Sequence, residues 1–115
     1  MLVLPLGDAV AEAITPTSLA RLNDRNRDDL RIALTIIKLA DTMAELMRFR
    51  GTHLTRITNA NPHHFHYGTA VTGVVLRPID DHGAVIALDD TIGLDTVSAV
   101  AILAVDMSLK EATTQ

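Results

Sequence analysis

The residues best suited to chemistry in this chain are histidines, and most of them lie in one segment. The run PHHFHY at 62–67 places three imidazoles within four residues. Neutral imidazole is a common ligand of transition metals, and in an extended segment His64 and His66 point to the same side. The candidates for a further ligand are His53, His82 and Asp81. Because the spacing matches no established zinc motif, the favoured interpretation is a polar or interface loop, with a divalent metal or a pH-sensitive contact as alternatives.

Two pairs of adjacent carboxylates are candidates for acid–base catalysis. Asp80-Asp81 and Asp89-Asp90 each lie in a predicted turn, where aspartate bonds to the local backbone. Adjacent residues of an extended chain point to opposite faces, so neither pair converges on a substrate. The chain has no cysteine, and none of its serines lies in the context of a nucleophile elbow. We therefore expect a non-enzymatic protein without a resident cofactor.

A second set of candidates consists of arginines that could contact nucleic acid. Arg48, Arg50 and Arg56 lie close together near the histidine segment, where they could bind a phosphate backbone. The formal net charge of the chain is −4, which disfavours nucleic acid as a partner. Nucleic-acid binding is therefore kept as an alternative.

Length and composition limit the architecture that can position these residues. The 115 residues predict a single domain, and 48% are hydrophobic but only 3% aromatic. An aliphatic core favours helix packing and small barrels over an aromatic-lined ligand pocket. The sequence has no run of about 20 apolar residues and no signal-peptide pattern. We expect a soluble protein of the cytoplasm or of a virion, without a membrane partner.

Residues 26–50 predict one long, strongly apolar helix. Asn26 suits its N-cap and Gly51 the position after its end. A helix on the surface of a monomer needs an apolar stripe on one side only, whereas this helix is apolar around most of its circumference. We therefore expect a second copy of the chain to pack against part of it. The predicted contact residues are Ile32, Ile36, Leu39, Met43 and Met47 on the helix and Leu2 and Leu4 in an N-terminal arm.

Residues 53–106 predict a small antiparallel sheet or barrel. The expected strands are 53–58, 69–76, 84–88, 91–95 and 97–105, with a bend or bulge at Gly73. Residues 1–25 are assigned to an arm and a short helix, and 107–115 to a tail. The predicted fold class is thus α+β, with N-terminal helices followed by the small sheet.

The stretch VTGVVLRPIDDHGAVIALDDTIGLDTVSAVAIL, Val71–Leu103, resembles Sm-like and related small-barrel domains. In these domains a strand bent at a glycine is followed by a tight turn, a second strand, a short third strand and a final strand. An N-terminal helix often precedes the barrel. The resemblance implies a strongly bent sheet whose open edges pair with neighbouring copies to form rings. Phage connector and decoration proteins also use small β modules of this kind.

These observations predict a homo-oligomeric structural or assembly protein, with a phage connector or decoration subunit as the setting. Its partners would be further copies of itself and other assembly proteins. Two alternatives stay open. One is an Sm-like nucleic-acid-binding regulatory module, and the other is a small metal-binding protein that uses the segment His63–His66.

Overall fold

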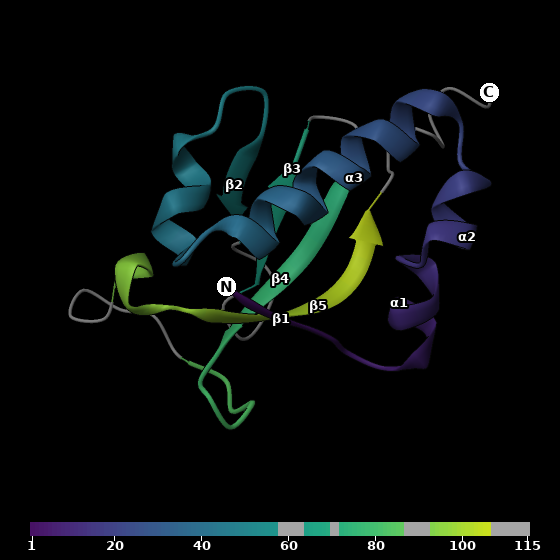
Figure 1. Ribbon diagram of the computed structural model, residues 1–115. Coiled ribbons are helices and arrows are strands. Elements are labelled where there is room, and N and C mark those ends of the chain that lie inside the picture. The colour runs from purple at the N-terminus through teal and green to yellow at the C-terminus, as the bar shows by residue number, and fades with distance from the viewer. Residues whose placement is uncertain (58–63, 70–71, 87–92, 107–115) are drawn as a thin grey trace.

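The strands form one open, mixed sheet, and the longest helix lies across one of its faces (Figure 1). The computed structural model describes residues 1–57, 64–69, 72–86 and 93–106. In these residues the strands are β1 (Leu2–Pro5), β2 (His53–Arg56), β3 (Phe65–Gly68), β4 (Gly73–Ile79) and β5 (Ala99–Asp106). The α-helices are α1 (Asp8–Ala13), α2 (Pro16–Ala20) and α3 (Asp24–Leu39), and the short 3-10 helices are η1 (Met43–Arg48) and η2 (Leu94–Thr96). The predicted α+β class is confirmed.

The sheet has the order β1-β5-β4-β3-β2 and is neither closed nor purely antiparallel. Strands β2, β3, β4 and β5 pair in antiparallel fashion with their neighbours. Strand β1 pairs in parallel with β5, and Leu2 lies opposite Ala99. The prediction of an antiparallel sheet or barrel is therefore wrong in two respects: one pair of strands is parallel, and the sheet does not close into a barrel. The N-terminal arm forms β1, an edge strand of the chain's own sheet, because it bonds to β5.

The single long helix predicted for residues 26–50 is wrong. Helix α3 ends at Leu39, Ala40 has an extended backbone, and the chain restarts as η1. Thr42 and Glu45 have the spacing of a capping box, and the Glu45 carboxylate accepts a hydrogen bond from the Thr42 N–H at 3.3 Å. The N–H of Met43 donates to the Val97 carbonyl at 2.9 Å, which ties the new turn to the segment before β5. The break therefore has its own capping and tertiary hydrogen bonds.

The start of α3 also differs from the prediction. The N-cap is Asn23, whose side chain accepts a hydrogen bond from the Asn26 N–H at 2.8 Å. Asn26 lies one turn further on and is buried. Its side-chain oxygen accepts a hydrogen bond from the Thr72 hydroxyl at 2.8 Å. This bond joins α3 to the residue that precedes β4.

Three of the predicted strands, 53–58, 69–76 and 97–105, correspond to β2, β4 and β5, whose first and last residues differ from the predicted ones. Gly73 begins β4 rather than bending it, and the irregularity of register lies between Val75 and Leu76. Of the predicted strand 84–88, the described residues form only an isolated bridge between Val85 and Ile79. Of the predicted strand 91–95, the described residues enter η2 instead. Residues 87–92 and the predicted tail 107–115 lie outside the described residues.

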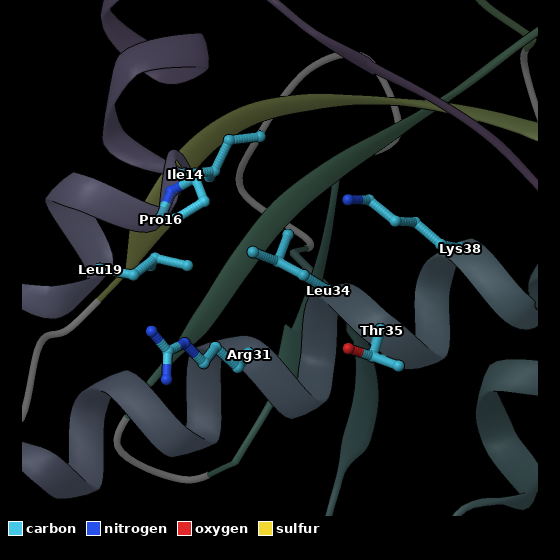
Figure 2. A pocket seen from close by; sticks show the side chains of 7 residues that line it. All are labelled: Ile14, Pro16, Leu19, Arg31, Leu34, Thr35 and Lys38. Carbon is cyan, nitrogen blue, oxygen red and sulfur yellow. The ribbon is translucent and has the colours of Figure 1, made fainter.

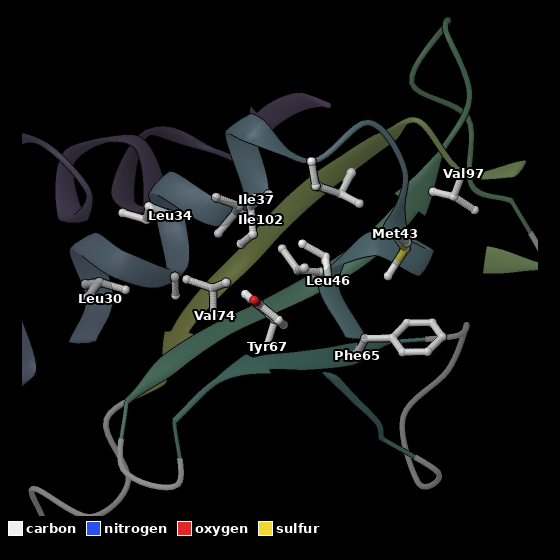
Figure 3. Close-up of a cluster of buried hydrophobic side chains, with 14 of the residues drawn as sticks. Leu30, Leu34, Ile37, Met43, Leu46, Phe65, Tyr67, Val74, Val97 and Ile102 are labelled. Carbon is white, nitrogen blue, oxygen red and sulfur yellow. The ribbon is translucent and has the colours of Figure 1, made fainter. Parts of the chain in front are cut away.

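The core lies between the sheet and the helices α3 and η1 (Figure 3). The face of the sheet that points toward α3 carries large buried side chains, among them Tyr67, Leu76 and Ile102. Leu30, Leu34 and Ile37 cover them from α3, and Met43 and Leu46 do so from η1. The opposite face of the sheet is called the outer face below. Of the predicted contact residues it carries Leu2 and Leu4, whereas the other five lie on α3 and η1.

Candidate interaction surfaces

The outer face of the sheet carries rows of side chains that cross several strands. Directly paired residues of neighbouring strands point to the same face, so the register defines each row. The first row is apolar and consists of Leu2, Ala99, Ile79 and Val85. Ala99, Ala101 and Ile79 form a small hydrophobic cluster of their own, against which Leu103 packs. The outer face therefore has an apolar half on β1, β5 and the end of β4.

Three leucines extend this apolar half to the edge of the sheet. Leu2 is 50% exposed, Leu4 41% and Leu6 48%. Among the described residues, β1 pairs with β5 alone, so its other edge is open. An open edge strand without charged residues is a template for pairing with another chain.

The backbone of β1 limits how that edge can pair. The N–H groups of Leu2 and Leu6 donate to Ser98 and Ile102 of the neighbouring segment, at 3.1 and 2.9 Å. Because backbone groups alternate in direction along a strand, those of Val3 and Pro5 face the open edge. Val3 offers one donor and one acceptor, whereas Pro5 has no N–H. The edge can thus form one complete pair of hydrogen bonds, centred on Val3.

The other half of the outer face carries histidines and one arginine. The register places His66 opposite Thr55 on one side and Val75 on the other. The pairing of Phe65 with Leu76 places His64 beside Arg77. His64 Nε2 and Arg77 Nε are buried and have no hydrogen-bond partner. The side chains of His64, His66 and Arg77 are half-buried, whereas Thr55 at the edge is exposed, so this polar part of the outer face is only partly open to solvent.

The candidate metal ligands are not brought together. His53 begins β2 and lies opposite Gly68, and His82 lies in the turn after β4. The ring of His66 covers Gly73, where an added Cβ would lie 2.8 Å from Nε2. No three histidine, aspartate or glutamate side chains of the described residues are close enough to hold a metal ion. His63 lies outside the described residues.

The candidate nucleic-acid arginines are exposed at the β2 side of the molecule. Arg48 ends η1, Arg50 precedes Gly51, and the guanidinium of Arg56 lies 5.3 Å from the centre of the Phe65 ring. The ion pairs within the described residues involve only Arg25 and Arg27, which bond to aspartates of α3. Arg48, Arg50 and Arg56 therefore have no carboxylate partner there.

The predicted helix contacts divide between surface and core. Ile32, Leu39 and Met47 are exposed, and Leu39 is the most exposed of them at 75%. Ile36 is half-buried against the core. Met43 is fully buried inside the chain, so it is not available to a second copy.

A groove that was not predicted from the sequence lies between α3 and the helices α1 and α2 (Figure 2). Its volume is about 320 Å³. Its lining residues are Ile14, Pro16, Leu19, Arg31, Leu34, Thr35 and Lys38. The sequence does show Arg31, Thr35 and Lys38 on one stripe of a helix, but the wall facing them comes from short helices whose placement needed the structure.

Among the residues that the structure describes, two ionisable groups have shifted pKa values with clear causes. The N–H groups of Ala84 and His82 bond to the Asp80 carboxylate at 2.9 and 2.8 Å and lower its pKa below the usual value. Burial raises the pKa of Tyr67, and a 2.8 Å hydrogen bond to Thr52 partly opposes that shift. Asp80 stabilises a turn and Tyr67 the core, so neither shift marks a catalytic site.

Comparisons with protein-family models, curated proteins and solved structures find no match. None of the described helices is long and apolar enough to cross a membrane.

Proposed function

We propose that this protein is a non-enzymatic assembly subunit that associates with further copies of itself. The observation that carries the proposal is the apolar half of the outer face, which continues into the open edge of β1. Leu2, Leu4 and Leu6 are each 41–50% exposed and sit beside buried Ala99 and Ala101. Contiguous exposed apolar surface of this kind marks sites of protein association.

The proposed contact is a pairing of β1 with β1 of a second copy. In an antiparallel pair centred on Val3, the two Val3 residues would exchange both N–H···O=C bonds. The leucines of both strands would then cover one another on the outer face. Such a contact is self-complementary, as a two-fold symmetric dimer requires. A phage connector or decoration subunit as the setting rests on the strand pattern of Val71–Leu103 alone.

The test is the mass in solution, measured by light scattering at several concentrations. We expect a dimer or larger assembly for the parent and a monomer for Leu4→Arg, because a buried arginine without a partner is costly. Thr55→Arg is the matched control, since Thr55 is exposed on the outer face at the opposite edge. Circular dichroism of each variant is the control for correct folding. A parent that stays monomeric at high concentration would refute the proposal.

Nucleic-acid binding is the second candidate, favoured by the exposed arginines of the β2 side. Arg48, Arg50 and Arg56 have no carboxylate partner among the described residues, which leaves their charge available to phosphates. Retention on a polyanion column should then fall with salt, and Arg56→Gln should weaken it. Arg25→Gln is the control, because Arg25 already lies 4.0 Å from Asp29.

A further inference from the structure

The groove between α3 and the pair α1–α2 combines an apolar wall with a row of polar side chains. Leu19 and Leu34 are buried at its base, and Ile14 and Pro16 close the side formed by the short helices. Figure 2 shows Arg31, Thr35 and Lys38 extending from α3 on the side that faces these apolar residues. This surface lies on the helical layer, apart from the sheet face proposed for assembly.

The groove carries two cations, Arg31 and Lys38, whose charges are not paired within the described residues. The aspartates of α3 bond to Arg25 and Arg27, which precede the groove along the helix. Arg31 and Lys38 make no ion pair with the described residues, and both are exposed. Two unpaired cations thus line one groove, although the net charge of the whole chain is −4.

The spacing of the polar row suits one elongated anionic ligand. Positions i, i+4 and i+7 lie on one face of a helix, so Arg31 and Lys38 start about 10 Å apart along its axis. Thr35 lies between them and contributes a hydroxyl that can donate a hydrogen bond. Both long side chains can bend toward an anionic group placed over Thr35.

We propose that this groove binds a small anionic amphiphile, which has one hydrocarbon chain and a carboxylate or phosphate head. The cations and the Thr35 hydroxyl would hold the head, and Ile14, Leu19 and Leu34 would contact the chain. A bare anion or a nucleic-acid backbone would leave this apolar wall unused. A volume of about 320 Å³ is at the lower end of the range for small-molecule sites. A groove of this volume can hold one short acyl chain.

The experiment is a titration of the whole chain with decanoate and with decyl phosphate, below the concentrations at which they form micelles. Isothermal calorimetry should show saturable binding of one molecule per chain. Arg31→Gln and Lys38→Gln should each weaken binding about tenfold, because each removes a charge-assisted hydrogen bond. Arg25→Gln should leave the affinity unchanged, since Arg25 lies on the same helix but outside the groove.

Further probes separate the parts of the proposal. Butyrate and inorganic phosphate should bind more weakly than decanoate, because they lack the chain that contacts the apolar wall. Equal affinity for these probes, or equal affinity of the groove variants and the parent, would overturn the proposal. So would binding only to vesicles of anionic lipid, which would identify a membrane surface instead. A cooperative thermal unfolding transition is the control that each variant is folded. Light scattering of the same samples tests the proposed self-association independently of ligand binding.

Discussion

The hydrogen bond between Thr72 and Asn26 gives a sharp test of how the helix is attached to the sheet. Thr72→Val keeps the shape of the side chain and removes the hydroxyl. Thr72 is fully buried and Asn26 is 6% exposed, so the Asn26 oxygen would lose its 2.8 Å partner without gaining access to water. Leaving a buried acceptor unpaired costs about 1–3 kcal/mol. In a domain of this size each kcal/mol lowers the melting temperature by about 4 °C.

The assay is urea unfolding followed by far-UV circular dichroism. Thr72→Val should lower the midpoint without changing the slope. Thr55→Val is the control, because the Thr55 side chain is exposed and its hydroxyl makes no hydrogen bond with the described residues, and it should change stability by less than about 0.5 kcal/mol. Adding Asn26→Leu to Thr72→Val should recover part of the loss, since both polar partners are then gone. A Thr72→Val protein as stable as the parent would show that this bond does not hold α3 in place.

Three further predictions concern the core, a glycine and a turn. Ile37→Ala should cost about 2–5 kcal/mol because Ile37 is fully buried, whereas Leu39→Ala should be within about 0.5 kcal/mol of the parent, both measured by urea unfolding. Gly68→Ala should lower the melting temperature, because φ is +154° and the new Cβ would lie 2.3 Å from the Thr72 carbonyl oxygen. The lowered pKa of Asp80 stabilises the fold above the usual carboxyl range, and this contribution is lost as the pH falls through the lowered pKa. In melting curves between pH 2 and 6, Asp80→Asn should therefore lose less stability toward acid than the parent, and identical acid profiles would contradict this.

The fold class could be predicted from the sequence, but the side of α3 that faces the core could not. Residues 30–40 are apolar on nearly every side, so hydrophobic periodicity does not separate the core residue Ile37 from the exposed Leu39. The choice depends on where the sheet lies. Asn23 and Asn26 are equally good cap residues by type, and only the burial of Asn26 distinguishes them.

The break before η1 does have a signal in the sequence. Thr42 and Glu45 have the spacing of a capping box, which marks a helix start inside the region predicted as continuous. The parallel pairing of β1 had no local signal, because its partner strand lies at the other end of the described chain. The groove was equally hidden, since Ile14, Pro16 and Leu19 of its apolar wall are far in sequence from the cations of α3.

The placement of β1 also has a consequence for the order of folding. The other pairings of the sheet join strands that follow one another in the chain, whereas Leu2 must find Ala99 across almost its whole described length. Closing so long a loop costs entropy, so β1 is expected to dock after the folding transition state. Substitutions in β1 should then accelerate unfolding more than they slow folding. The strand proposed to join two copies is thus also the strand expected to detach first.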